Sequence, residues 1–143
     1  MRLLKENGFT LIELMITVAI ISILATIAIP SYADYIKRSK ITEAVSTLAG
    51  MRVKLEQYFQ DSRQYTGACT AGIAPQPVDT QNFLYTCPTL NATGYLIRAT
   101  GTNSMTGFTY TIDQANVRIT ETVPAGWGGA LATCWVLRKD GSC

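Results

Sequence analysis

The chain has 143 residues, 48% of them hydrophobic, and a formal net charge of +2 from 12 basic and 10 acidic side chains. This size suits one domain together with one separate apolar segment. Because the charge balance is so weak, the chain as a whole has no electrostatic drive toward nucleic acid. The sequence contains no histidine, so the commonest general base and the commonest metal ligand are both missing.

Enzymatic function is the weakest interpretation of this sequence. It has no nucleophile motif and no glycine-rich phosphate loop, and its carboxylates are dispersed along the chain. We therefore expect no catalytic residues, no cofactor and no metal, and the interpretation depends on the N-terminal segment and the cysteines.

Residues 9–29 form an apolar segment of 21 residues whose only charge is Glu13. As a helix, this segment would be about 32 Å long at 1.5 Å per residue, and the hydrocarbon core of a bilayer is about 30 Å thick. Arg2 and Lys5 precede the segment and would remain in the cytoplasm, which places the rest of the chain outside. The segment is therefore a candidate for a single membrane span.

The position of this apolar segment differs from that of an ordinary secretory signal. Such a signal is cut after its apolar region at a small-residue site, but here the segment runs to Pro30 and then into a helical pattern. No cysteine lies near the start, which argues against a lipoprotein. We therefore expect the apolar segment to be retained in the mature protein.

Glu13 is the anomaly within the apolar segment. A carboxylate inside a membrane helix costs roughly 2.5 to 3.5 kcal/mol even on the lenient insertion scale, so it indicates a function that needs a partner. The alternative is a charge near the helix end that reaches interfacial water. Periodicity alone leaves both interpretations open.

Residues Gly8–Leu14, with the sequence GFTLIEL, resemble the processing motif of type IV prepilins. That family has a short basic leader, glycine before the cleavage site, phenylalanine after it, and glutamate at the fifth mature position. Gly8, Phe9 and Glu13 match these three positions, and the similarity continues to about Tyr35. Beyond Tyr35 only the layout is shared. The motif is specific, because several demanding positions coincide at the extreme N-terminus.

The resemblance implies that a membrane aspartyl prepilin peptidase cuts between Gly8 and Phe9 and N-methylates Phe9. Glu13 would then pair with the terminal amine of a neighbouring subunit, which is a favourable solution for a carboxylate in an apolar core. The implied partners are other pilin subunits, the peptidase and the assembly machinery of the inner membrane. The implied location is the inner membrane, with the head in the periplasm, and the extracellular pilus after assembly.

An amphipathic helix is predicted after Pro30, because apolar residues recur there at spacings of three and four. A single helix from about Phe9 to Gln60 would be about 78 Å long. Its second half is expected to cover one face of a sheet. The apolar positions are Ile41, Ala44, Val45, Leu48, Met51, Leu55, Tyr58 and Phe59.

Four runs rich in β-branched and aromatic residues predict an antiparallel sheet. A fifth run, Thr133–Leu137, is expected either to pair with this sheet or to form its edge, and residues 61–82 are expected to be a loop. Trp127 and Trp135 are expected in the core. The four runs are Phe83–Thr86, Tyr95–Thr100, Phe108–Ile112 and Val117–Val123.

The expected fold class is α+β, with a long N-terminal helix packed on a C-terminal antiparallel sheet, as in the pilin fold. We expect three parts in the chain. Residues 1–8 are a leader peptide, residues 9–30 a helix for the membrane or the filament core, and residues 31–143 an amphipathic helix with a globular head.

The four cysteines, Cys69, Cys87, Cys134 and Cys143, are expected to form disulfides, because an even count in an exported chain favours them. Three connectivities are possible. Short loops favour Cys69 with Cys87 and Cys134 with Cys143, and each bond would contribute about 2.5 to 3 kcal/mol in the chain-entropy model. Four free thiols are the alternative.

Three functions fit the sequence, and the first is a structural subunit, major or minor, of a type IV pilus. The second is a minor pilin that captures DNA for natural transformation, for which Arg98, Arg118, Arg138 and Lys139 would have to share a face. Four scattered surface charges are the simpler explanation of these residues. The third is a pseudopilin of type II secretion. The sequence does not separate these functions, nor does it decide among roles in adhesion, twitching motility and competence.

Overall fold

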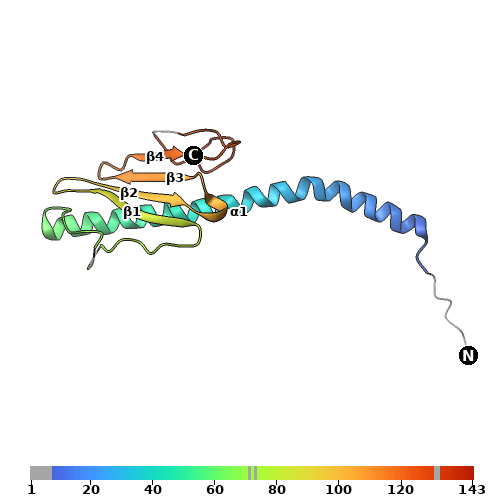
Figure 1. The fold of residues 1–143 in the computed structure, drawn as a ribbon, viewed down its shortest axis with the longest axis horizontal. Helices are drawn as coiled ribbons and strands as arrows, with labels where there is room; N and C mark the ends of the chain where they lie inside the picture. Colours follow the sequence, from blue (N-terminus) through green and yellow to red (C-terminus); the bar gives the residue numbers. More distant parts are fainter. Residues whose placement is uncertain (1–7, 71, 73, 131–132) are drawn as a thin grey trace, which may run out of the picture. The chain divides into compact units, whose positions relative to one another are not determined.

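The computed structural model describes residues 8–70, 72, 74–130 and 133–143, which form one long helix followed by a sheet (Figure 1). Helix α1 spans Leu11–Ser62, and Pro30 lies inside it without ending it. The strands are β1 (Phe83–Leu90), β2 (Tyr95–Gly101), β3 (Thr109–Asp113) and β4 (Arg118–Thr122), with the short 3₁₀ helix η1 (Asn103–Met105) between β2 and β3. The predicted α+β arrangement is confirmed.

The chain divides into two compact units, and the boundary falls within α1 between Tyr35 and Ile36. The second unit, Ile36–Cys143, holds the remainder of α1 and the whole sheet, and we call it the head unit. All the strands and both disulfides lie in the head unit.

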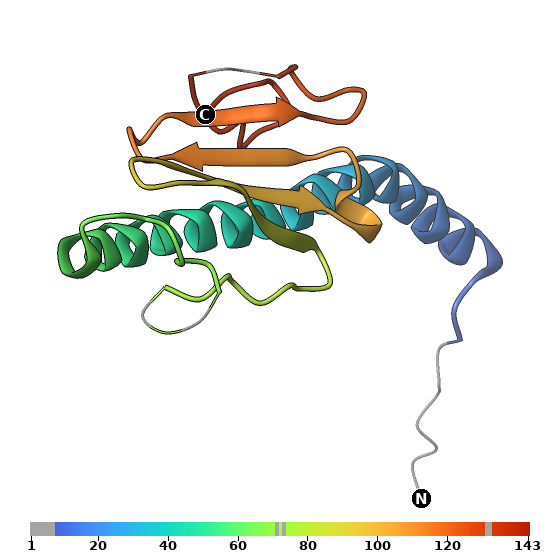
Figure 2. The same cartoon turned by 60° about the vertical axis from the view of Figure 1, so that its left-hand side comes forward.

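The sheet of the head unit has the strand order β1-β2-β3-β4, and every neighbouring pair is antiparallel (Figure 2). Side-chain oxygens close two of the turns. The Asn91 Oδ1 atom accepts hydrogen bonds from the backbone N–H groups of Thr93 and Gly94 between β1 and β2. Between β3 and β4, Asp113 Oδ1 accepts one from the N–H of Val117 at 2.8 Å. Such turns suit short Asn and Asp side chains.

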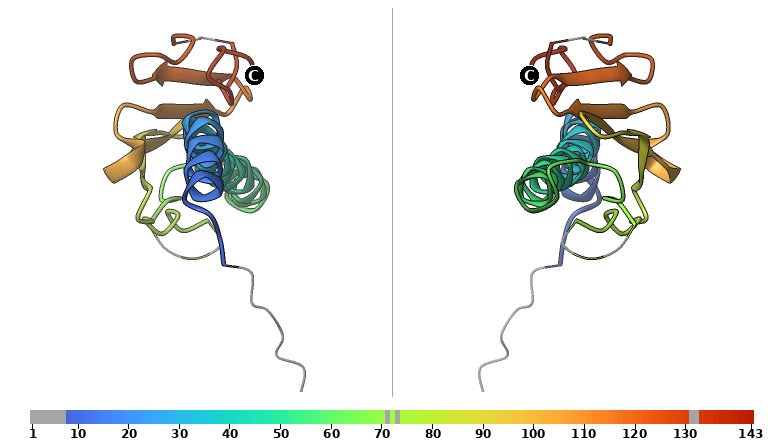
Figure 3. Two further views of the ribbon diagram at one scale, coloured as in Figure 1. Left: turned by 90° about the vertical axis from the view of Figure 1, so that its right-hand side faces the viewer. Right: turned by 90° about the vertical axis from the view of Figure 1, so that its left-hand side faces the viewer.

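Helix α1 packs across one face of the sheet within the head unit (Figure 3). The helix buries one residue every three or four positions, whereas β2 buries every second residue, as the two periodicities require. Trp127 and Trp135 are 8% and 7% exposed and belong to the same core, as predicted. The buried positions of α1 are Ile41, Ala44, Leu48, Met51 and Leu55.

The loop before β1 protects the outer edge of that strand. Asp79 Oδ1 accepts the backbone N–H of Tyr85 at 2.8 Å, and Gln76 Nε2 donates to the carbonyl oxygen of Tyr85 at 2.8 Å. A disulfide between Cys69 and Cys87 ties the same loop to β1, with their Cα atoms 6.6 Å apart. An uncovered strand edge can pair with a strand of another chain, so these contacts protect β1 from such pairing.

The prediction of a strand at Thr133–Leu137 is wrong, because this segment has no strand structure. The reason is a side chain of β4. The Thr120 hydroxyl donates to the carbonyl oxygen of Cys134 at 2.9 Å and accepts the N–H of Val136 at 2.8 Å. One hydroxyl therefore satisfies two backbone groups that a strand would have paired with a neighbouring backbone.

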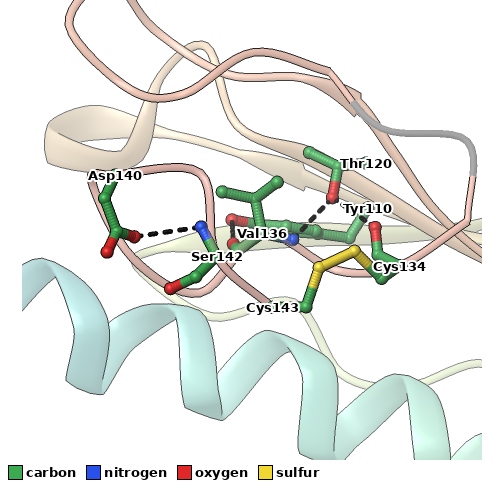
Figure 4. Close-up of a disulfide and its surroundings, with 7 residues drawn as sticks. All are labelled: Tyr110, Thr120, Cys134, Val136, Asp140, Ser142 and Cys143. Carbon is green, nitrogen blue, oxygen red and sulfur yellow. Dashed lines mark hydrogen bonds between the residues drawn. A yellow bond between two sulfur atoms is a disulfide. The ribbon is translucent and has the colours of Figure 1, made fainter.

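The last ten residues form a loop closed by a disulfide between Cys134 and Cys143 (Figure 4). This loop approaches the turn after β4 at Gly128. A Cβ atom on Gly128 would collide with the backbone of Gly141, and Gly141 itself has a φ of +86°. Both glycines are needed here, one for the close approach and the other for its left-handed backbone.

Two buried tyrosines donate hydrogen bonds across the core of the head unit. Tyr110 donates to the carbonyl oxygen of Val136 at 2.9 Å, and Tyr95 donates to Glu56 Oε1 of α1 at 3.1 Å. Burial raises the pKa of Tyr110. Burial, together with the Glu56 carboxylate, raises the pKa of Tyr95.

We expect Thr120→Val to lower the free energy of unfolding by about 2 to 3 kcal/mol, because it leaves the buried N–H of Val136 without a partner. Chemical denaturation of the full chain in detergent, followed by near-ultraviolet circular dichroism, measures the loss. Thr122→Val is the control. It removes an exposed hydroxyl that donates to Thr109, and it should cost less than about 1 kcal/mol. Equal losses in the two variants would contradict the role of Thr120.

The free energy of unfolding should fall as the pH rises above about 10. In that range an unfolded tyrosine loses its proton while buried Tyr95 and Tyr110 keep theirs, so the folded state binds more protons. Each raised group contributes up to about 1.4 kcal/mol per pH unit. Denaturation between pH 8 and pH 12 checks the slope, which should be shallower in Tyr110→Phe. Phe108→Leu, which alters a buried side chain that does not titrate, is the control. It should lower the free energy of unfolding and leave the slope of that free energy against pH unchanged.

Candidate functional site

The N-terminal junction is exposed, and α1 begins directly behind it. Gly8 is exposed, and Phe9 is 81% exposed. The hydroxyl of Thr10 accepts the backbone N–H of Glu13 at 3.3 Å, and the Thr10 carbonyl oxygen accepts the N–H of Leu14 at 3.2 Å. Thr10 therefore caps α1.

A threonine followed three residues later by glutamate is the capping-box pattern, and the sequence reasoning on Glu13 did not include this signal. The pattern places Glu13 in the first turn of α1, where a negative charge interacts favourably with the helix dipole. The carboxylate that the processing motif requires thus also suits the start of the helix.

The apolar part of α1 is exposed along its length. Leu11, Ile16 and Ile23 are 75%, 53% and 65% exposed, and none of the most apolar window of the helix is buried. The helix is long and apolar enough to cross a membrane, with a mean hydropathy of 2.5 over that window. A large apolar surface without cover marks a site of interaction with a membrane or another protein.

The four basic residues singled out from the sequence do not share one face. Arg98 of β2 pairs with Thr111, which pairs with Ile119, so these three side chains lie on one face of the sheet. Arg118 pairs with Ile112, and these two residues are the chain neighbours of Ile119 and Thr111. Because successive residues of a strand face opposite sides of the sheet, Arg118 lies on the opposite face from Arg98. The alternation of the strands separates Arg98 from Arg118.

Arg98 already has an acidic partner. Its Nε and Nη2 atoms donate to the two carboxylate oxygens of Glu121 at 3.1 and 3.0 Å, and each side chain is about one third exposed. This two-pronged geometry is specific, although a partly exposed pair adds little stability. The sequence alone did not identify Glu121 as the partner of Arg98, because this pairing depends on the register of strands β2, β3 and β4.

Arg118 lies over an aromatic ring. Its guanidinium carbon is 5.0 Å from the centre of the Trp135 ring, which is within the range of a cation–π contact. Trp135 is held in turn, because its Nε1–H donates to the carbonyl oxygen of Thr111 at 2.9 Å. Arg118 itself is exposed, so its charge remains available at the surface.

Arg138 and Lys139 are adjacent and exposed in the C-terminal disulfide loop. The loop is held by short contacts: Gly141 donates to the Arg138 carbonyl oxygen at 3.0 Å, and the N–H of Ser142 donates to Asp140 Oδ1 at 3.0 Å. The hydrogen bonds from Ser142, and then the charges of Arg138 and Arg38, lower the pKa of Asp140. Arg38 comes from α1, about a hundred residues earlier, so its approach to this loop was not visible in the sequence.

Comparisons with known proteins agree with this architecture. Residues 3–29 match the sequence profile of the prokaryotic N-terminal methylation motif. Residues 30–111 match the profile of a family described as "Type IV minor pilin ComP, DNA uptake sequence receptor". A solved structure of the non-core minor pilin PilV from Neisseria meningitidis superposes with a TM-score of 0.52 at 14% identity, covering 63% of this chain and 91% of that one.

Relatives with curated descriptions match less than half of this chain. The type IV major fimbrial protein FimA of Dichelobacter nodosus (strain VCS1703A) is 50% identical over 66 residues, which are 46% of this chain and 38% of FimA. Another FimA of Dichelobacter nodosus is 57% identical over 56 residues, which are 39% of this chain and 35% of that protein. The match thus spans less than half the length of either relative.

A long N-terminal helix whose apolar start lies in a methylation motif, packed on an antiparallel sheet, defines the class of type IV pilins. The second profile covers more than half of the residues of this chain. The chain therefore belongs to the type IV pilins and, among them, to the ComP family of minor pilins. The prediction of a type IV pilin is confirmed. This family and fold are structural and are not known for enzymatic activity.

Proposed function

We propose that this chain is a structural subunit of a type IV pilus, assembled with other pilins into a helical filament. The exposed apolar part of α1 carries this proposal, because it needs a cover that its own unit does not provide. Lipid covers it before assembly, and copies of the same helix cover it in the filament. Contacts that repeat head to tail without closing build such a polymer.

Processing creates the partner of Glu13 in this proposal. The peptide between Gly8 and Phe9 is exposed and lies just before α1, so a peptidase can reach it. Cleavage there releases an amine on Phe9, which is then N-methylated. In an apolar filament core the carboxylate of Glu13 needs an opposite charge, and the amine of a neighbouring subunit supplies it.

The proposal also assigns a location and partners. Before assembly the subunit is a single-pass protein of the inner membrane, oriented by Arg2 and Lys5 of the leader, with its head in the periplasm. Residues 1–8 are the leader, residues 9–30 the membrane and filament-core helix, and residues 31–143 the head with its amphipathic helix. Prepilin peptidase and the inner-membrane assembly machinery act on it, and the assembled pilus is extracellular.

Mass spectrometry of filaments sheared from cells tests the processing step. The expected mass is that of a chain beginning at Phe9 with one added methyl group and two disulfides. A mass that includes Met1 would refute the cleavage. The copy number in the same preparation distinguishes a major subunit from a minor one.

Substitution of Glu13 in the same cells tests the pairing. Glu13→Leu should enter the membrane more readily, because a carboxylate costs roughly 2.5 to 3.5 kcal/mol there, yet it should enter filaments at least tenfold less. Thr17→Val, which changes a polar residue one turn further along α1, is the control and should assemble normally. Normal assembly of Glu13→Leu would rule out the pairing.

A second candidate function is capture of DNA, favoured by the description of the family that matches residues 30–111. Arg138 and Lys139 are the residues best suited to it, since both are exposed in the C-terminal loop. Arg118 is exposed as well and is positioned over Trp135. Arg98 lies on the other face of the sheet and is paired with Glu121, so it is the least suited of the four.

The double variant Arg138→Gln/Lys139→Gln should bind a DNA duplex more weakly than the natural chain at about 50 mM salt. The logarithm of the affinity falls as the logarithm of the salt concentration rises. If both residues contact phosphates, this dependence should become less steep by about 0.9 for each residue replaced. Arg98→Gln removes a basic residue that is already paired with Glu121, and this variant should bind as the natural chain does. Absence of binding by the natural chain at this salt concentration would eliminate the DNA function.

A further inference from the structure

Three basic residues follow the apolar segment closely, on the side that the proposed function places outside the cytoplasm. Lys37, Arg38 and Lys40 come eight to eleven residues after Ile29, all within α1. Basic residues near a membrane span normally stay on the cytoplasmic side. Their location here runs against that tendency and places positive charge close to the outer surface of the membrane. This step depends on the proposed orientation of the subunit.

Two of these helix cations, Arg38 and Lys40, interact with other parts of the head unit. Lys40 Nζ donates to the hydroxyl of Ser104 in η1 at 2.7 Å. Arg38 lies near the C-terminal loop, where it acts with Arg138 on the carboxyl group of Asp140, and Figure 4 shows this loop beside α1. We call Lys37, Arg38, Lys40 and Arg138 the basic collar.

Nearby carboxylates do not cancel the charge of the collar. Residues 36–43 and 138–140 together contain five cations, including Lys139, and two anions, Glu43 and Asp140. Glu43 accepts a hydrogen bond from Asn82 Nδ2 at 3.0 Å. With Asp34, which lies just before the head unit, the local net charge is still positive.

We propose that the basic collar binds anionic phospholipid headgroups of the membrane leaflet from which the head emerges. Along a helix, the eight residues from Ile29 to Lys37 correspond to about 12 Å. The headgroup layer extends roughly 5 to 8 Å beyond the hydrocarbon core, and Lys and Arg side chains are long enough to reach back toward it. A lipid surface is therefore the phosphate-bearing partner nearest to the collar before assembly.

This contact gives the unassembled subunit a resting position. Each Lys or Arg near an anionic surface favours binding by about fivefold, and the attraction falls off within a Debye length. The machinery that moves the subunit into the filament then has to separate the collar from the lipid as well as withdraw the apolar helix.

Native mass spectrometry of the full processed chain in detergent tests the proposal. Phosphatidylglycerol, which is anionic, and phosphatidylcholine, which is zwitterionic, are titrated with identical acyl chains. The chain should bind phosphatidylglycerol at least tenfold more tightly. Lys37→Gln/Arg38→Gln/Lys40→Gln should lose this preference, and Arg138→Gln should reduce it about fivefold.

Lys54→Gln/Arg63→Gln is the control, since it removes two exposed cations from the other end of α1, Lys54 within the helix and Arg63 just after it. It should keep the full preference for phosphatidylglycerol. Equal binding of the two lipids by the natural chain would overturn the proposal, as would an unchanged preference in the triple variant. A collar that binds a DNA duplex but shows no lipid preference would also overturn it. Because isolated subunits are used, these outcomes do not depend on whether the chain assembles into pili.

Discussion

One constraint governs this protein: a single helix must be covered by two different surroundings. In the head unit, α1 is amphipathic and buries Ile41, Leu48 and Leu55 against the sheet. Before Pro30, α1 is mostly apolar, with Glu13 as its one charge, and it is exposed. The remainder of the structure follows from this division, because the sheet covers one part of the helix and leaves the other to lipid or to further copies of the chain.

The head unit is built to leave few backbone groups open to unwanted partners. Asp79 and Gln76 occupy the outer edge of β1, and a disulfide at Cys87 reinforces the same strand. At the other side of the sheet, Thr120 of β4 holds the C-terminal segment. A subunit that polymerises through one surface benefits from such protection, because an exposed strand edge would compete with the intended contacts.

Much of this fold could be predicted from local patterns. The length of α1, the strands β2, β3 and β4, and the burial of Trp127 and Trp135 all follow from periodicity and composition. The features that escaped prediction depend on contacts between distant residues. Thr133–Leu137 has the composition of a strand, yet a hydroxyl of β4 takes its backbone groups. Likewise, strand register decides that Arg98 meets Glu121 while Arg118 faces the other way.

The hydroxyl of Thr120 has a consequence for how the C-terminal loop can diversify. Its two hydrogen bonds go to backbone atoms, the carbonyl oxygen of Cys134 and the N–H of Val136. This attachment is therefore independent of which side chains the segment carries further along. Arg138, Lys139 and Asp140 can be exchanged without loss of these two bonds, so related proteins could acquire new surface chemistry here while keeping the attachment of the segment to the sheet.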